Sequence, residues 1–410
     1  MKVANASGFW GDDNYAALEI VEQVSDIDFI TLDYLAELSL SIMAIQKEKE
    51  PELGYARDFI EVVRSLENKT QAKLITNAGG LNPLGLKRAL EQVTKRKVVA
   101  VYGDDVLKAI KEDPSNPLYN NLDSGNSLDE FKEQLKTANV YLGAEAIVDA
   151  LKQGAEIVVT GRVADPSLTL AAAIYTYGWT NPDLLAQGTI AGHLIECGCQ
   201  VTGGLWTNYE KLKERPGFPI VEFEEDGSFI VTSYSGTVNL ETVKEQLLYE
   251  MGDPSSYISP DVTVSILDLK LRDLGKRRVK VTGAKGYKAT NTYKVSATYA
   301  AGYRAEGELL FIGKKGKKRA EKVAKEIIDK INPEKSQIDV IADKERAFLR
   351  LAAYDKDEKK IKAFVRSFAP YVTAGPPGTT GYTGGRAQIK PVFGYWPCLF
   401  LKDKVCVSVT

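Results

Sequence analysis

The residue types best suited to chemistry gather in one short segment, residues 191–204. It contains His193, the single histidine of the 410-residue chain. On a helix, His193 shares a face with Glu196, three residues later, and with Cys197, four residues later. An imidazole beside a carboxylate can move protons near neutral pH, and an imidazole beside a thiol can generate a nucleophile. We predict that His193, Glu196 and Cys197 are catalytic; the alternative is a buried, hydrogen-bonded histidine with a packing role.

The same segment offers donor atoms for a metal ion. His193, Glu196, Cys197 and Cys199 are all ligand types, but their spacing matches no common zinc site, and the sequence has no Cys-x-x-Cys pair. We therefore assign no metal ligands. The cofactor stays unknown, with a divalent metal left open.

A second polar cluster, residues 160–167, follows a predicted strand. Arg162 could hold a carboxylate or phosphate by a bidentate contact, so we predict it as substrate-binding. Asp165 stands directly before Pro166, a residue favoured at the start of a helix. Asp165 is therefore either a second acid/base, which is our prediction, or simply the N-cap of that helix.

Further polar residues follow other predicted strands. Asn77 stands just before Gly79 and Gly80, and glycines between a strand and a helix let backbone amides approach an anion. Asp12 and Asp33 also follow strands, and carboxylates at one sheet edge suit acid/base work or a magnesium ion. We predict all five residues as substrate-binding. Turn formation and helix capping are the alternatives.

The elements that must position these residues alternate in type over the first half of the chain. Short apolar segments separated by helical patterns predict an α/β fold with a mostly parallel sheet covered by helices. The predicted strands are 2–6, 28–33, 72–77, 97–102, 139–142 and 157–160. The predicted helices are 14–24, 35–49, 55–66, 144–153, 166–177 and 181–197. Ligands of such sheets bind beyond the carboxyl ends of the strands.

After residue 212 the pattern changes. Longer alternating strands are predicted at 229–234, 262–269, 278–282, 290–298 and 306–312, with helices at 240–250 and 319–331. The tail is predicted to start with a helix at 344–351 and to contain a Gly/Pro-rich loop at 375–386. We divide the chain into an α/β domain (1–212), an α+β domain (213–331) and a C-terminal segment (332–410).

The composition of the chain argues against nucleic acid and membranes as partners. The chain has 53 basic and 55 acidic residues and a net charge of −2, which gives no field to attract nucleic acid or an anionic membrane. No run of about 18 apolar residues occurs, so we expect no transmembrane helix. Four cysteines without a disulfide framework, and no signal-peptide pattern, predict a cytoplasmic protein. We expect a small-molecule partner and leave a homo-oligomer open.

Several stretches resemble the acyclic terpene utilisation (AtuA) family, a family catalogued as a domain of unknown function. The strongest stretch is residues 191–204, and the others are residues 75–83, 141–144, 154–165, 245–250 and 293–296. Together with shorter similarities they run in order over about residues 3–315, whereas the tail after about 332 departs from the pattern. The resemblance implies catabolism of acyclic terpenes through acyl-CoA intermediates. It also strengthens a functional role for His193, although it transfers no catalytic residue.

These observations favour a cytosolic enzyme that acts on a carboxylic acid or an acyl-CoA as a hydratase, lyase or hydrolase, in acyclic terpene or branched-acid catabolism. In this hypothesis His193 is the general acid/base and Glu196 orients it. The alternative is a non-catalytic acyl-CoA-binding or partner subunit of a catabolic complex. A dehydrogenase is disfavoured because the sequence lacks the full dinucleotide fingerprint. The sequence has no P-loop signature either.

Overall fold

The computed structural model describes residues 1–36, 38–381 and 385–410. The chain divides into two compact units, one formed by Met1–Ala297 with Tyr395–Thr410 and the other by Thr298–Gly394. The boundaries that we predicted at residues 212 and 331 fall inside these units rather than between them. All of the predicted site residues lie in the first unit.

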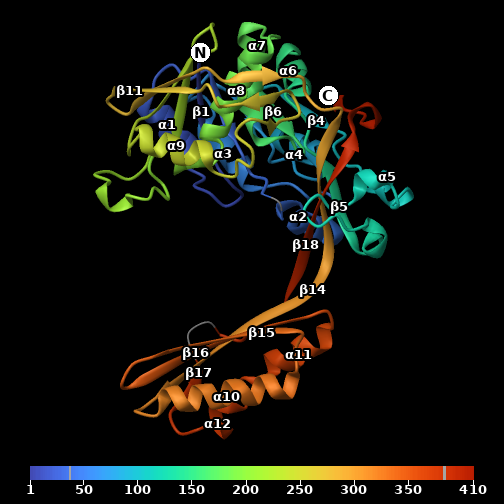
Figure 1. Ribbon diagram of the computed structural model, residues 1–410, viewed down its shortest axis with the longest axis vertical. Helices are drawn as coiled ribbons and strands as arrows, with labels where there is room; N and C mark the ends of the chain where they lie inside the picture. The colour runs from blue at the N-terminus through green and yellow to red at the C-terminus, as the bar shows by residue number, and fades with distance from the viewer. Residues whose placement is uncertain (37, 382–384) are drawn as a thin grey trace. The chain divides into compact units, whose positions relative to one another are not determined.

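The first unit is built on a ten-stranded sheet whose centre is parallel (Figure 1). The parallel strands lie in the order β1 (Lys2–Asn5), β2 (Phe29–Leu32), β3 (Lys73–Thr76), β6 (Ile157–Thr160) and β4 (Val98–Tyr102). Antiparallel strands extend both edges: β7 (Pro219–Phe223), β8 (Phe229–Ser233), β12 (Arg278–Thr282) and β11 (Lys270–Gly275) beyond β1, and β19 (Ser408–Val409) beyond β4.

The mixed α/β class is thus confirmed, but the sheet is parallel only at its centre. The segment after residue 212 does not begin a separate α+β domain. Its strands β7, β8, β12 and β11 continue the sheet of the N-terminal half by backbone pairing that starts at β1.

Both faces of the parallel strands are buried, as their nearly continuous apolar sequences require. On β6, Ile157 and Val159 belong to one hydrophobic core, and Val158, which points to the opposite face, is equally inaccessible to solvent. The helices of that core are α1 (Ala16–Gln23), α2 (Ser39–Lys49), α3 (Asp58–Leu66) and α4 (Pro83–Leu90). Other helices packed in this unit are α5 (Leu107–Glu112), α6 (Glu145–Lys152), α7 (Asp165–Tyr177), α8 (Pro182–Ile195) and α9 (Leu240–Leu248).

Two predicted elements are wrong in type or in place. The strand expected at 139–142 is β5 (Leu135–Val140), which pairs with β14 (Thr292–Ile312) instead of joining the parallel strands. The helix expected at 344–351 is a strand, β16 (Arg346–Asp355), in which buried and accessible residues alternate. Its two-residue period, which is that of a strand, decides the structure.

A small three-stranded sheet completes the first unit near the candidate site. It pairs β9 (Tyr257–Ile258), β10 (Thr263–Ser265) and β13 (Lys285–Tyr287). Among the described residues, no helix combines the length and apolar character needed to span a bilayer.

The second unit has its own sheet, in the order β15 (Lys335–Ala342), β16, β14 and β17 (Thr379–Gly381). Its core lies between this sheet and the helices α10 (Gly316–Ile331) and α11 (Glu358–Ser367). The short helix α12 (Tyr371–Ala374) and the long strand β18 (Lys390–Leu401) follow. The segment that we predicted as a loop, residues 375–386, contains the strand β17, which pairs antiparallel with β14. Residues 382–384 of this segment lie outside the described part.

Candidate active site

His193 lies in the last turn of α8, which begins with Asn181 as N-cap and Pro182 as its first residue. The helix approaches α7 closely because Gly192 faces Pro166, whose carbonyl oxygen would be only 2.5 Å from an added Cβ. At the other end, Asn5 of β1 donates from Nδ2 to the carbonyl of Ile195 at 2.7 Å. The end of a helix leaves carbonyls without partners, and Asn5 fixes this one against the sheet.

His193 and Glu196 form the contact that their spacing predicted. His193 Nδ1 lies 2.9 Å from Glu196 Oε1, and His193 Nε2 lies 3.2 Å from the backbone carbonyl of Leu247, near the end of α9. A carbonyl can only accept, so Nε2 carries a hydrogen. A further proton bound by the pair can then reside on Nδ1 or on the carboxyl of Glu196.

Burial decides how tightly this pair holds its proton. Desolvation raises the pKa of Glu196 to about 7, against the lowering effect of His193. Burial by itself would lower the pKa of His193. The Glu196 carboxylate and the hydrogen bonds that the imidazole makes to Glu196 and to the carbonyl of Leu247 outweigh burial, so that pKa is raised. Both groups therefore bind the proton more strongly than they do in water.

The two oxygens of Glu196 differ. Oε1 is held by His193, whereas Oε2 is buried and has no hydrogen-bond partner among the described residues. An unsatisfied buried carboxylate oxygen is costly, so this position favours a proton or a polar ligand group. Glu196, and not His193, is thus the member of the pair with an atom left for a substrate.

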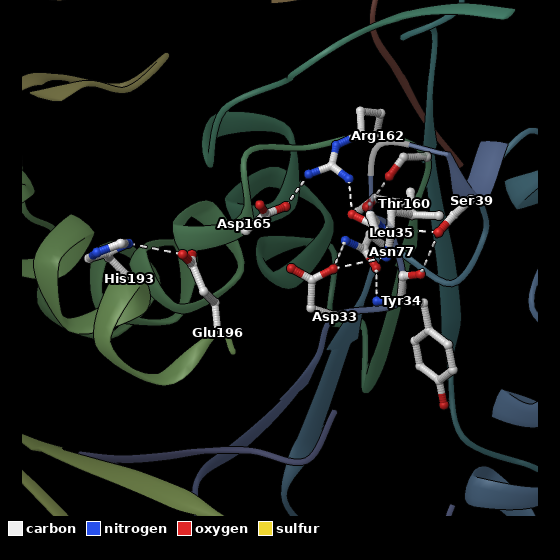
Figure 2. A network of polar contacts seen from close by, with 12 residues as sticks. Asp33, Tyr34, Leu35, Ser39, Asn77, Thr160, Arg162, Asp165, His193 and Glu196 are labelled. Atoms are coloured by element: carbon white, nitrogen blue, oxygen red, sulfur yellow. Dashed lines mark hydrogen bonds and ion pairs between the residues drawn. The ribbon is translucent and has the colours of Figure 1, made fainter. Parts of the chain in front are cut away.

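Asp165 and Arg162 form an ion pair beside the His193–Glu196 pair (Figure 2). Arg162 is 2% exposed, donates through one Nη to the carbonyl of Leu35 and through the other to Asp165, and lies 4.3 Å from the centroid of the Tyr141 ring. These contacts make Arg162 an organiser of the loops rather than an accessible substrate ligand. Asp165 is the first residue of α7, since Ala164 occupies the N-cap position, and its side chain is one-third exposed.

Asp33 and Asn77 form a second group of hydrogen bonds, which is joined to Arg162 through Leu35 (Figure 2). Asn77 Nδ2 donates to Asp33 Oδ1 at 2.6 Å, and Asn77 Oδ1 accepts from the backbone N–H of Tyr34 at 2.7 Å. The N–H of Leu35 donates to Asp33 Oδ1 at 3.0 Å. Burial raises the pKa of Asp33, with Arg162 acting against it. Both ends of the Asn77 amide are used within the protein, so the network holds the loop after β2 in place.

Gly79, Gly80 and Asp12 also have structural partners. An added Cβ on Gly79 would lie 2.5 Å from the carbonyl oxygen of Thr160, so this glycine permits close packing of the turn against β6. Gly80 has φ +50° and donates its N–H to the carbonyl of Asn77 at 3.1 Å. Asp12 accepts from the N–H groups of Gly8 and Asp13. These contacts are those of turns.

A cavity of about 200 Å³ lies where the His193–Glu196 pair and Asp165 face one another. It is closed mainly by polar side chains that sequence reasoning did not single out. Tyr257 of β9 places its ring centroid 5.5 Å from that of His193. The other new polar residues around the cavity are Tyr141, Glu250, Thr290, Thr292, Tyr293 and Lys294.

Four of these missed residues were visible in the sequence. Stretches that carried the family resemblance, at 141–144, 245–250 and 293–296, contain Tyr141, Glu250, Tyr293 and Lys294. The backbone N–H of Tyr141 donates to the carbonyl of Lys294 at 2.9 Å, which places the two side by side. Asn77, Gly79, Gly80, Arg162, Asp12 and Asp33, the six predicted substrate-binding residues, are not among the described residues that line the cavity.

The thiols do not support a cysteine nucleophile. Burial raises the pKa of Cys197 well above its usual range, with Glu196 adding to the effect, and raises that of Cys199 to about 12. Both groups therefore remain protonated near neutral pH, whereas a nucleophile must be a thiolate. In the described parts of the chain, no three histidine, cysteine or acidic residues are arranged to hold a metal ion.

The candidate site is thus a buried acid–imidazole pair beside a polar cavity, on a sheet with a parallel centre. Comparison with known families then shows where the chain belongs. The model of the acyclic terpene utilisation family protein AtuA matches residues 1–410. The chain therefore belongs to this family. The match continues beyond residue 315, through the tail that we expected to depart from the family pattern. A comparison with curated proteins gave no match.

Proposed function

We propose that this protein is an enzyme that moves a proton on a small carboxylic acid, or on the acyl end of a CoA thioester, as a hydratase, lyase or hydrolase. The observation that carries the proposal is the buried His193–Glu196 pair, which lines a polar cavity and in which Glu196 Oε2 has no hydrogen-bond partner among the described residues. A carboxyl whose pKa lies near 7 can take or give a proton at neutral pH.

The proposal reverses the roles that we expected for His193 and Glu196 from the sequence. Both nitrogens of His193 are engaged, by Glu196 and by the carbonyl of Leu247. In the proposal, Glu196 is the general acid/base and acts through Oε2. His193 holds Oε1 and adjusts how readily the carboxyl releases its proton.

Lys294 supports a carboxylate or thioester carbonyl as the group that is bound. It is the only lysine or arginine among the described residues that line the cavity, and its Nζ lies 5.6 Å from the centroid of the Tyr141 ring. The acidic residues Asp165, Glu196 and Glu250 line the same cavity. In the proposal, Lys294 orients an anionic or polarised oxygen, and the atom that exchanges a proton lies toward Glu196.

The size of the cavity favours a small reacting group. About 200 Å³ is below the roughly 300–1,000 Å³ typical of pockets for drug-sized ligands. A short acid, or the acyl end alone of a larger thioester, fits this volume. Acyclic terpene or branched-acid catabolism is the setting that the family name supports.

The test is a screen of short and branched acids, and of their CoA thioesters, with the wild-type protein and Glu196→Gln. Proton exchange in D₂O and the addition or loss of water are followed by NMR. We expect one class of substrate to react with the wild type only, since glutamine keeps the hydrogen bond to His193 but cannot exchange the proton. Equal turnover by Glu196→Gln would refute the assignment.

The same screen addresses the non-catalytic alternative. Binding of an acid or acyl-CoA that stabilises the wild type, without turnover of any substrate, would instead support a binding subunit. Lys294→Gln is a useful companion variant. It should weaken binding while leaving the His193–Glu196 pair intact.

A further inference from the structure

Strand β15 forms one edge of the sheet of the second unit. It pairs with β16 in an unbroken antiparallel register, from Lys335 opposite Tyr354 to Ala342 opposite Ala347. In the described part of the chain it has no strand on its other side. One row of its backbone N–H and C=O groups therefore points away from the sheet, as in any edge strand.

This edge has few of the features that usually block pairing with another chain. The eight residues of β15 include no proline or glycine, and the register shows no bulge. Ile341 is 73% exposed and Ile338 is 46% exposed, so each sheet face near the edge presents an isoleucine. The charged residues of the strand are only Lys335 and Asp339.

We propose that β15 pairs antiparallel with β15 of a second copy of this chain, joining two sheets into one across a twofold axis. Edge-to-edge addition supplies partners for the outward backbone groups and covers part of the exposed isoleucines. A second copy fits because the strand is complementary to itself, as its two charged residues show.

Symmetry limits the register. With the axis perpendicular to the sheet, each residue must lie opposite one on the same face. One residue of the strand therefore lies opposite its own copy, and the axis passes midway between the two. Centred on Gln337, the register places Lys335 opposite Asp339 of the other copy, and this happens twice. Centred on Asp339, it would place two carboxylates opposite each other, which is unfavourable. Centred on Ile338, it would leave Lys335 opposite an isoleucine. The charges therefore select Gln337.

The proposal is independent of the candidate active site. β15 belongs to the second unit, whereas His193, Glu196 and the cavity belong to the first. A failure of either proposal therefore does not affect the other.

The experiment measures the self-association of the full-length chain by sedimentation velocity over a range of protein concentrations. The variants are Lys335→Asp, Asp339→Lys and the control Lys344→Asp, which makes the same charge change as the first at an exposed position beyond the strand. We expect a wild-type dimer, and each single variant at 335 or 339 should raise its dissociation constant by about tenfold, because two attractive pairs become repulsive. The control should leave it unchanged.

Mixing the first two variants gives the decisive result. In the Gln337-centred register, a mixed dimer restores two opposite-charge pairs, so the mixture should associate about as tightly as the wild type. Thermal unfolding checks that each variant is folded. A monomeric wild type at every concentration, or a dimer with the same affinity in all variants and mixtures, would overturn the proposal.

Discussion

Two clusters of buried polar residues lie close together in the first unit (Figure 2). They differ in whether a fully buried atom is left without a hydrogen-bond partner. In the Asp33–Asn77 cluster, both ends of the Asn77 amide bond to groups of the same loops. In the His193–Glu196 cluster, one carboxylate oxygen has no partner among the described residues. The sequence presented both as candidate site residues.

The difference shows how a structural polar cluster can be told from a functional one. Burial raises the pKa of both Asp33 and Glu196, so a shifted pKa does not distinguish them. The distinction is access to the cavity of about 200 Å³, which is lined by Glu196 and not by Asp33. A satisfied network stabilises the fold, and an unsatisfied group at a cavity can act on a ligand.

The largest expected difference between the two clusters is in turnover, which should depend on Glu196 far more than on Asp33. Glu196→Gln should lower kcat/KM by about 10²–10⁴-fold, the usual contribution of a general acid/base. Asp33→Asn, the matched isosteric change, should keep turnover within a few-fold because asparagine can still accept from Asn77 and Leu35. Steady-state kinetics on the substrate found in the screen measures both. Equal losses would mean that the clusters act as one site.

The free energy of unfolding should depend more on the Asp33–Asn77 cluster than on the His193–Glu196 cluster. Asn77→Ala removes a fully buried side chain and leaves Asp33 and the N–H of Tyr34 without this partner. We expect the free energy of unfolding to fall by about 1–3 kcal/mol for each of these two groups. Glu196→Gln should change it by less. Urea unfolding compares the variants, and a stable Asn77→Ala protein would contradict the structural role of the cluster.

The pH dependence of stability isolates the His193–Glu196 pair. Both pKa values are raised on folding, so the native state keeps its proton at a pH where the unfolded chain has lost it. This contribution is fully present at pH values below the unfolded pKa of Glu196. It is lost as pH rises through about 7, by at most about 1.4 kcal/mol per pH unit for each proton. Melting curves from pH 5 to 9 should therefore fall more steeply for the wild type than for Glu196→Gln.

The single histidine allows the smallest predicted effect to be measured directly. In ¹⁵N NMR of histidine-labelled protein, only His193 contributes imidazole signals. Its apparent pKa should lie above the ordinary value in the wild type, because the Glu196 carboxylate outweighs burial. In Glu196→Gln, burial remains without that charge, so the pKa should drop below the ordinary value, by about one unit or more. An unchanged pKa would show that Glu196 does not control the imidazole.

The sequence by itself determined the local elements and the central contact of the site. Five short apolar segments became the parallel strands because fully buried strands need continuous apolar residues. The three-residue spacing of His193 and Glu196 on a helix brought them into contact, since helical geometry fixes which residues share a face. Family membership followed from ordered motifs along the chain.

Only the tertiary structure decided which polar residues remain available to a ligand. Asn77 bonds to Asp33, 44 residues away in the sequence, and this long-range contact engages its amide within the protein instead of at a substrate. The carbonyl of Leu247, 54 residues from His193, occupies the imidazole Nε2, so that Glu196 and not His193 keeps an atom without a partner among the described residues. The tertiary structure also decided that the strands after residue 212 extend the first sheet. These outcomes rest on long-range pairing and burial, whose partners are set by packing of the whole chain rather than by local sequence pattern.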